Sequence, residues 1–459
     1  MNRRQFLELG GAAAINLAAW PEWANALKST PVSMLRGEHL SLRIEPLKVE
    51  LAKGVEIATI GYNGMVPGPI LRMKEGVPVT IDVENRSGMD ELVHWHGLKI
   101  ESLQDGAAEE GAPVVPAGGR LRYRFTPAPS GTRWYHTHAM AMDNLQRGGY
   151  SGQFGFLYVE PKNEPGRYDR EVFMAIHHWG PSLMEMGSPE SDRMVGYKYA
   201  SFNDKILGAG EPLRVKQGER VLFRFLNASG SQNTLIALPG HVFTVMALDG
   251  NPVPNPQAVK TLQLGVAERV DAIVEMKAPG VWVLGATEEQ ERMSGLGHVI
   301  EYAGYKGEAK WANPGPSDWS YHLFEGKLTE RLAALPVEEI FPMVFKRVYL
   351  PQNGMDTWMI NSSSFPRMES LKVRQGRRYR LQFMNASREE HPVHLHRHSF
   401  ELKSIAGVPT NGIIKDTVMV PRYGSAEVEF TADNPGRTLF HCHQQIHMDY
   451  GFMQLIDYV

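Results

Sequence analysis

The chain has 459 residues, a formal net charge of −3, a single cysteine and ordinary proportions of apolar and aromatic residues. A nearly neutral chain of this size can form two to four domains, and it lacks the basic excess of a nucleic-acid-binding protein or a polybasic membrane anchor. One cysteine also excludes an intramolecular disulfide.

The N-terminal 26 residues resemble an export signal rather than part of a fold. Arg3 and Arg4 precede a weakly apolar stretch, Leu9–Trp20, which is too short to be retained as a membrane span, and Ala24–Ala26 offers a small-residue cleavage site. Paired arginines before a mild apolar stretch are typical of twin-arginine signals; the alternative is a frayed basic terminus. We therefore expect residues 1–26 to engage the twin-arginine export machinery, which places a mature chain without a membrane anchor in the periplasm.

Three segments further along the chain share one pattern. Each has a basic residue, a turn glycine, a run of alternating apolar side chains and an Asn-x-Ser turn, in Lys74–Ser87, Lys216–Ser229 and Arg374–Ser387. Period-two alternation between turn residues predicts half-buried strands. The repeat distances, 142 and then 158 residues, fit β-sandwich or barrel domains rather than a short solenoid repeat.

The repeats predict an all-β chain of three domains, at 35–163, 164–305 and 340–459. The stretch 306–339 is richer in glycine, proline and charge, so we expect it to be a connector. Within it, Leu328–Leu335 could form a short helix that Pro336 ends.

Histidines gather in four clusters. The clusters are His94 with His96, His136 with His138, His391 with His394 and His396, and His441 with Cys442, His443 and His447. A His-x-His pair on a strand points both imidazoles to one face, and imidazole is a preferred copper ligand. One such pair can be structural, but four in one chain indicate metal binding.

The histidine pairs occupy equivalent positions of the first and third domains. Positions nine and eleven after the repeat asparagine are His94 and His96 in one domain, and His394 and His396 in the other. We therefore expect the two domains to meet about a pseudo-twofold axis and to gather eight histidines, which suit three copper ions. The second domain has no ligand at the corresponding positions, which are Thr234, Ala237, Pro239, Gly285, Ala286 and Thr287. We expect it to act as a spacer that shapes a substrate cleft.

Three residues remain for a separate site: His391, Cys442 and His447. Two imidazoles and a thiolate are the trigonal ligand set of a blue-copper centre, and copper binding accounts for an unpaired cysteine in an oxidising compartment. A redox-sensing thiol is the alternative. Because His441 and His443 flank Cys442, the chain itself would link the blue-copper site to the histidine cluster.

These four clusters resemble the copper-binding motifs of the multicopper oxidase family, which includes laccases, ascorbate oxidases, ferroxidases and bacterial cuprous oxidases. The resemblance spans nearly the whole mature chain. It implies three cupredoxin-like Greek-key β-barrel or sandwich domains, four copper ions, and four one-electron oxidations of a donor coupled to the reduction of dioxygen to two waters. It also implies ligand roles: His391, Cys442 and His447 for type 1 copper, His94 and His394 for type 2, and His96, His136, His138, His396, His441 and His443 for the type 3 pair.

The chain departs from the cuprous-oxidase pattern at the axial type 1 position. That position, ten residues after Cys442, is Phe452, which cannot coordinate copper. We expect a three-coordinate site of relatively high potential, since the axial ligand tunes the potential. Met453 is the alternative axial residue.

Proton delivery is the second departure. Asp105, followed by Gly106, matches a family acid near the type 2 copper, and a surface turn is the alternative for it. The relay glutamate of bacterial relatives is replaced by Met448, and the side chain of Asp449 should point elsewhere. We therefore expect Asp105 to carry the protons for dioxygen reduction.

The electron donor is the least specified part of the function. Glu389 and Glu390 precede His391 and could accept a phenol proton or attract a metal cation, or be exposed acids without a role. We expect a laccase-type oxidase of phenols or aromatic amines, working as a monomer. The alternative is an oxidase of Cu(I) or Fe(II). Thioethers suit Cu(I), and methionines that could supply them are Met140, Met142, Met184 and Met186. A non-enzymatic copper carrier is weaker, because all eleven ligands are present.

Overall fold

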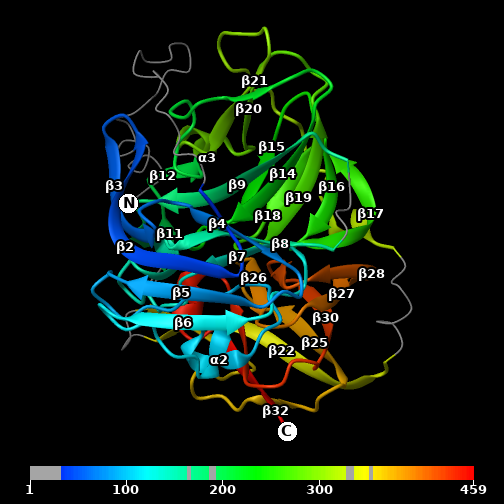
Figure 1. Cartoon of the computed structure of the whole chain (residues 1–459). Helices are drawn as coiled ribbons and strands as arrows, with labels where there is room; N and C mark the ends of the chain where they lie inside the picture. The colour runs from blue at the N-terminus through cyan, green and yellow to red at the C-terminus, as the bar shows by residue number, and fades with distance from the viewer. Residues whose placement is uncertain (1–32, 163–166, 186–192, 327–334, 351–354) are drawn as a thin grey trace.

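The computed structural model describes residues 33–162, 167–185, 193–326, 335–350 and 355–459 (Figure 1). The expected export signal and nearly all of the expected helix Leu328–Leu335 lie outside these ranges. Within them the regular elements are nearly all β-strands, with a few short helices, which confirms the predicted all-β class. None of the helices in these ranges has the length and apolar character needed to cross a membrane.

The strands between residues 34 and 160 form two four-stranded sheets. The first has the order β3 (Val55–Tyr62), β2 (His39–Ala52), β5 (Val79–Asn85), β6 (Arg120–Phe125). The second has the order β1 (Met34–Arg36), β4 (Gly68–Lys74), β8 (Phe154–Glu160), β7 (Gly131–His136). Along β5 buried and half-buried residues alternate, as predicted for a strand with one face on the core. The short α2 (Ser102–Asp105) and the 3₁₀ turn η1 (Ala108–Glu110) follow the first histidine pair.

The strands between residues 170 and 302 form a six-stranded and a five-stranded sheet. The larger has the order β12 (Tyr199–Phe202), β9 (Arg170–Trp179), β14 (Arg220–Asn227), β19 (Arg269–Glu275), β16 (Phe243–Leu248), β17 (Asn251–Val259). The smaller has the order β13 (Leu213–Val215), β21 (Gly297–Tyr302), β20 (Val281–Ala286), β15 (Thr234–Ala237), β18 (Thr261–Leu264). A separate hairpin pairs β10 (Ser182–Glu185) with β11 (Arg193–Gly196).

The strands between residues 337 and 458 repeat the second group element by element. The six-stranded sheet has the order β23 (Met355–Ile360), β22 (Val337–Leu350), β25 (Arg378–Asn385), β30 (Ser425–Thr431), β27 (Phe400–Ile405), β28 (Val408–Lys415). The five-stranded sheet has the order β24 (Leu371–Val373), β32 (Met453–Tyr458), β31 (Thr438–Cys442), β26 (His391–Leu395), β29 (Thr417–Val420). β22 begins at Val337, slightly before residue 340, and the helix α5 (Gln445–Asp449) follows the last histidine pair.

The repeated asparagines have one structural role in all three groups. The Nδ2 atoms of Asn85, Asn227 and Asn385 each donate to two backbone carbonyls, and each Oδ1 accepts from the amide of the serine two residues on, at 2.9 to 3.0 Å. A buried carboxamide that bonds three backbone groups fixes the loop after its strand. In the first and third groups this loop leads into the first histidine pair.

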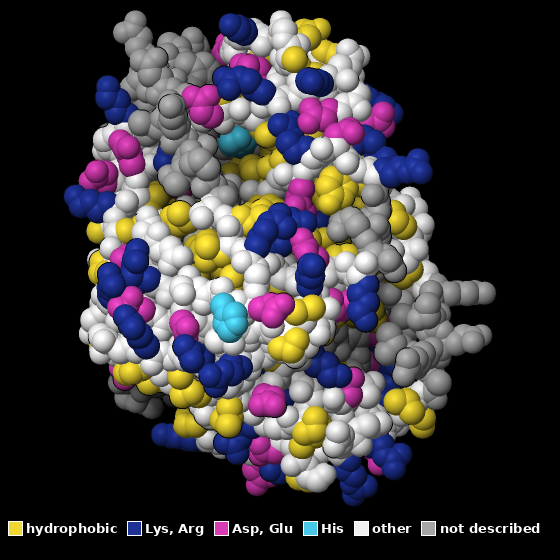
Figure 2. Space-filling view, viewed as in Figure 1, with side chains coloured by type: hydrophobic (Ala, Val, Ile, Leu, Met, Phe, Trp, Pro, Cys, Tyr) yellow, Lys and Arg dark blue, Asp and Glu magenta, His cyan; other side chains and the backbone are white. Residues whose placement is uncertain are grey.

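Figure 1 shows the second group above and the first and third groups below, with β7 and β26 near the centre of the molecule. On the face drawn in Figure 2, basic and acidic side chains are interspersed, and few histidines show. The histidines of the four clusters are 0 to 7 % exposed, except for His443, which is half-buried. Their chemistry therefore lies inside the molecule, where the groups meet.

Candidate metal centres

Strand pairing places the histidines of one group side by side. In the third group β26 pairs with β31, so that His394 lies opposite His441. In the first group His94 and His136 form an isolated β-bridge, with backbone hydrogen bonds of 2.8 and 3.1 Å. Both groups therefore present two His-x-His pairs on one face.

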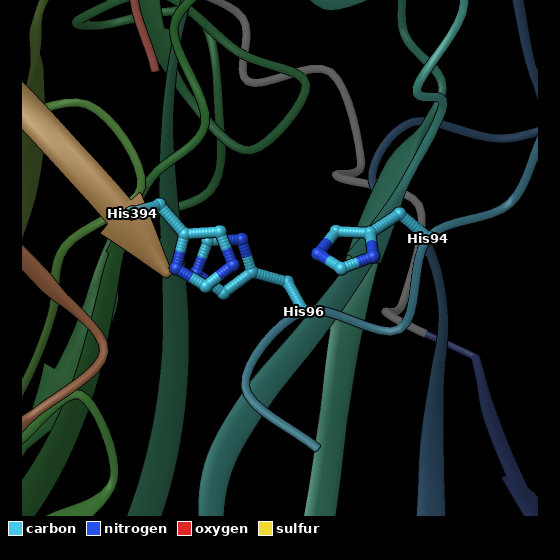
Figure 3. A group of neighbouring side chains, drawn as sticks. All are labelled: His94, His96 and His394. Atoms are coloured by element: carbon cyan, nitrogen blue, oxygen red, sulfur yellow. The ribbon is translucent and has the colours of Figure 1, made fainter. Parts of the chain in front are cut away.

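The two groups meet through these pairs. The rings of His96 and His394 stack at 3.7 Å between centroids, and those of His94 and His396 stack at 4.0 Å. Figure 3 shows His96 lying against His394, with His94 facing them from the first group. The first residue of one pair faces the second residue of the other, which is the arrangement that a pseudo-twofold axis requires.

The side chains of these residues form compact groups. Ligand atoms lie within 4.8 Å of one another in each of four sets: His94, His96 and His394; His96, His136 and His443; His138, His396 and His441; and His391, Cys442 and His447. All eleven residues singled out in the sequence as ligands therefore come together, eight in one cluster and three in another.

The imidazoles are oriented by hydrogen bonds at one ring nitrogen. The Nδ1 atoms of His94, His136, His394 and His441 lie 2.7 to 2.9 Å from the carbonyl oxygens of Asp105, Thr137, Asp416 and Cys442, respectively. Within the described part of the chain, the Nε2 atoms of His94, His136 and His394 have no hydrogen-bond partner, and those of His441 and His396 lie 3.0 Å apart. Buried ring nitrogens without partners that converge in this way fit metal ions, because protein ligands are usually oriented by hydrogen bonds behind them.

Burial determines the protonation state of the cluster. It lowers the pKa well below the usual histidine range, helped by neighbouring rings, at His96, His136, His138, His391, His394, His396, His441 and His443. The imidazoles are therefore neutral at physiological pH, which is the form that binds a metal.

The cluster of three is built around the buried thiol of Cys442. Its Sγ lies 3.7 Å from Nδ1 of His391 and 3.5 Å from Nδ1 of His447. The opposite ring nitrogens are held by Ser387 Oγ at 2.8 Å and Glu389 Oε2 at 2.9 Å, respectively. Burial raises the pKa of the thiol, and a metal ion offsets this effect because coordination stabilises the thiolate.

Phe452, and not Met453, packs against the rings of this cluster. The Phe452 ring is 5.0 Å from that of His391, and its backbone carbonyl accepts from the amide of Cys442 at 3.1 Å. Met453 is also fully buried, but packs in a separate cluster with Leu439 and Met448. The two candidate axial residues thus face different parts of the core.

Asp105 is fully buried beside the larger cluster, so it is not part of a surface turn. Its Oδ2 lies 2.8 Å from Nδ1 of His396 and 3.2 Å from Nδ1 of His94. The position depends on Gly106, which has a φ of 84°, and any Cβ there would collide with the carbonyl of Val93. The Asp-Gly sequence therefore brings the carboxylate against two histidines.

Two further acids, which the sequence analysis missed, belong to this site. Glu110 Oε1 lies 3.4 Å from Nδ1 of His396 and accepts from the amide of Leu439, and burial together with Asp105 raises its pKa well above the usual range. Glu109 Oε2 lies 3.7 Å from Nδ1 of His138. The adjacent acids four and five residues after Asp105 were the available signal.

Asp416 is the other residue that the sequence analysis missed. Its Oδ1 lies 3.1 Å from Nε2 of His96, and Arg269 donates to both carboxylate oxygens, at 2.8 and 2.6 Å. Arg133 lies 3.4 Å away, and all these side chains are fully buried. Burial alone would raise the pKa of Asp416, but the charge and hydrogen bonds of Arg269 hold it well below the usual range. An ionised Asp416 therefore supports His96 from behind.

Other residues considered for function lie away from the ligand atoms. Glu390 faces Arg422, at 3.8 Å, and Asp449 accepts from the amides of Ala141 and Met142, as expected for a side chain that points elsewhere. Met142 is 40 % exposed. Met186 lies outside the described residues.

Comparison with known proteins agrees with the chemistry of the donor atoms. Three family models, each described as multicopper oxidase, match residues 43–164, 183–306 and 343–457. Multicopper oxidase MmcO of Mycobacterium tuberculosis is 29 % identical over 91 % of this chain and 86 % of its own length. Copper resistance protein A of Pseudomonas syringae pv. tomato is 30 % identical over 63 % of this chain and 54 % of its own length.

A solved structure shows the same fold. The laccase from Botrytis aclada superposes with a TM-score of 0.73, at 20 % identity, over 97 % of this chain and 92 % of that one. The three cupredoxin-type domains implied by the resemblance are thereby confirmed, and copper is the cofactor that the donor set fits. The chain belongs to the multicopper oxidase family and is an oxidoreductase.

Proposed function

We propose that this chain couples four one-electron oxidations of a phenol or aromatic amine to the reduction of dioxygen to two waters. One observation carries the proposal. Cys442, in the buried set of three, is bonded on either side to His441 and His443, which belong to the cluster of eight histidines. This arrangement separates a site that accepts single electrons from a site large enough for several metal ions.

The geometry supports a ligand assignment. His391, Cys442 and His447 would hold the type 1 copper, and His94 and His394 the type 2 copper. The type 3 pair would be held by one set of His96, His136 and His443 and another of His138, His396 and His441. When bound, these ions supply one-electron redox chemistry and the reduction of dioxygen, as in the rest of the family.

The protein supplies the path and the protons between these sites. The carbonyl of Cys442 accepts from Nδ1 of His441 at 2.9 Å, which adds a hydrogen bond to the covalent link. Asp105, in contact with His94 and His396, would deliver protons to the cluster. A change that removes the carboxyl group of Asp105 would therefore alter dioxygen reduction without altering the Cys442 site.

The electron donor would bind next to Glu389. Its Oε2 bonds Nε2 of His447, and Arg347 lies 3.3 Å from its other oxygen. Burial favours the protonated acid, but His447 and the nearby arginines together lower the pKa of Glu389. An ionised carboxylate at the edge of a type 1 ligand can accept the proton that a phenol loses on oxidation.

Cu(I) is the second candidate donor, because of a methionine pair. Met184 and Met194 lie directly opposite each other on the hairpin β10–β11, and Met194 is 38 % exposed. Val195 of this hairpin packs with Ile446 of α5, the helix that carries His447. Thioethers suit Cu(I), and one relative is named a copper resistance protein.

Steady-state oxygen consumption by the copper-loaded protein would separate the two donors. We expect turnover with a phenol such as 2,6-dimethoxyphenol, and a reduced rate for Glu389→Gln. Oxygen consumption with Cu(I) alone would contradict the phenol proposal. If Cu(I) is the donor, the double change of Met184 and Met194 to leucine should raise its KM, whereas Met293→Leu, at another exposed methionine, should not.

We further propose that the chain is exported by the twin-arginine route to the periplasm and works there as a monomer with the three domain ranges given above. The paired arginines support the route. Replacement of Arg3 and Arg4 by lysine should leave the protein in the cytoplasm, which cell fractionation would detect.

A further inference from the structure

A cavity borders one side of the histidine cluster. Its lining includes four of the cluster histidines, His136, His138, His441 and His443, but none of the other four. The rest of its wall includes Thr137, Gln153 and Met448. Asp105 contacts His94 and His396, neither of which lines this cavity. A molecule in the cavity is therefore out of direct reach of Asp105, and Met448 cannot carry a proton.

A buried carboxyl group that the proposed mechanism does not use lies behind this wall. Glu91 is 0 % exposed, and its Oε2 accepts from the hydroxyl of Thr137 at 3.1 Å. Its Oε1 has no hydrogen-bond partner among the residues that the structure describes. The backbone of Glu91 is fixed by two hydrogen bonds to Val115, at 3.1 and 2.8 Å. Burying an ionised carboxylate at this depth costs free energy, so the protonated form is favoured. A buried acid of this kind is a candidate for a functional role.

The surroundings of Glu91 include charged groups and an exposed neighbour in the chain. The charged or titratable groups that face it, among the residues the structure describes, are Asp90, Arg147 and Tyr62. Asp90 is exposed, and its carbonyl accepts from Arg147 at 2.7 Å. Burial raises the pKa of Glu91, although Arg147, Thr137 and Gln153 oppose the rise. Glu91 therefore lies between the exposed Asp90, its neighbour in the chain, and Thr137, a residue that lines the cavity.

We propose that Glu91 delivers protons, through the hydroxyl of Thr137, to the side of the histidine cluster that Asp105 does not touch. For this transfer the Thr137 hydroxyl, whose oxygen lies 3.1 Å from Glu91 Oε2, turns its hydrogen toward the cavity. The O–H bond of the Glu91 carboxyl then breaks as its proton passes to Thr137 Oγ1, and Thr137 gives its own hydroxyl proton to a molecule in the cavity. Solvent then reprotonates the Glu91 carboxylate. Dioxygen, four electrons and four protons give two waters, so two acids on different sides divide the protons of one turnover. This inference rests on the proposed reduction of dioxygen at the cluster.

The test compares Glu91→Gln with Glu91→Asp and with Asp90→Asn, the exposed neighbour, in the copper-loaded protein. Three quantities are measured: oxygen consumption against pH, anaerobic bleaching of the blue band by the donor, and infrared absorption of protonated carboxyl groups. We expect Glu91→Gln to lower oxygen consumption by about tenfold or more and to bleach at the normal rate. It should also lose one carboxyl band that wild type shows at neutral pH. Glu91→Asp should keep most of the activity, and Asp90→Asn should match wild type.

Each alternative outcome is decisive. Unchanged oxygen consumption in Glu91→Gln, or a loss in Glu91→Asp equal to that in Glu91→Gln, would overturn the proposal. If Glu91→Gln does not load copper, the infrared spectra of wild type and Glu91→Asp test the proposal instead. A spectrum that shows Glu91 ionised at neutral pH would also contradict the proposal. Wild-type protein that consumes no oxygen with any donor would instead contradict the proposed function itself.

Discussion

The second and third domains have the same strand order but different contents at corresponding positions. In the third domain His394 pairs with His441 between β26 and β31, and in the second Ala237 pairs with Gly285 between β15 and β20. The amide of Cys442 bonds the carbonyl of Phe452, and the amide of Ala286 bonds that of Leu296, both at 3.1 Å. The fold is therefore independent of the metal ligands.

The comparison also shows what the second domain contributes. Although it carries no ligand, its strand β19 extends Arg269 to Asp416, the carboxylate that supports His96. Asp249 and Glu268, also from the second domain, flank the buried Lys415 at 2.9 and 3.1 Å. The domain is more than a spacer, because its charges hold the third domain in place behind the cluster.

The largest expected effect comes from a change at one position that the second and third domains share in their folds. Cys442→Ser should abolish the blue absorption band and the oxidation of every donor, because a serine hydroxyl cannot replace the thiolate. Ala286→Ser, at the corresponding position of the second domain, should keep both. A blue band in Cys442→Ser would contradict the assignment of Cys442, as absorption spectra of the copper-loaded variants would show.

Asp105→Asn should have the next largest effect. Removing the proton carrier should slow oxygen consumption by about a hundredfold or more, while anaerobic bleaching of the blue band stays normal. Stopped-flow absorption under nitrogen and an oxygen electrode give the two rates. Equal slowing of both rates would show that Asp105 acts on the structure of the site and not on its protons.

Arg269→Met tests the contribution of the second domain. Breaking a fully buried ion pair costs on the order of 3–5 kcal/mol. The lowered pKa of Asp416 stabilises the fold above pH about 3.9, its usual value, and this stabilisation disappears as the pH falls toward the lowered pKa. The variant should therefore lose most stability at pH 7 and progressively less below pH about 4. Urea denaturation at pH 7 and below pH about 4 measures the loss in the free energy of unfolding. An equal loss under the two conditions would contradict the role of the Asp416 charge.

Phe452→Met should have the smallest effect. A methionine thioether beside the Cys442 site should lower its reduction potential, since the axial ligand tunes the potential. Leu296→Met, at the corresponding position of the second domain, should leave it unchanged. Redox titration of the blue band measures both, and an unchanged potential in Phe452→Met would refute the axial assignment.

The sequence was sufficient to predict the all-β class and the convergence of the eleven ligand candidates, because its repeated segments show which positions of different domains are equivalent. Asn85 and Asn385 mark the same turn in two domains, so the histidines that follow them had to occupy equivalent strands. Asp105 was predicted by motif, although its burial depends on a close approach of Gly106 that no local pattern shows.

The rest depends on contacts between distant segments. The alternation in β14 predicts a half-buried strand, but seven of its eight residues are buried. Its second face also meets the first domain, because Leu226 packs in one cluster with Phe154 and Phe156, and Arg224 lies over Tyr158. Arg269 and Asp416 are 147 positions apart and each looks ordinary in its own strand. Burial of Glu91 likewise depends on the loop that carries Arg147.

The number of electrons that the donor loses per dioxygen consumed tests the central claim most directly. A copper-loaded protein that uses the Cys442 site and the histidine cluster together should consume one dioxygen for every four one-electron oxidations of a phenol. An oxygen electrode measures the dioxygen consumed, and no hydrogen peroxide should accumulate. Two electrons per dioxygen, with hydrogen peroxide accumulating, would contradict it.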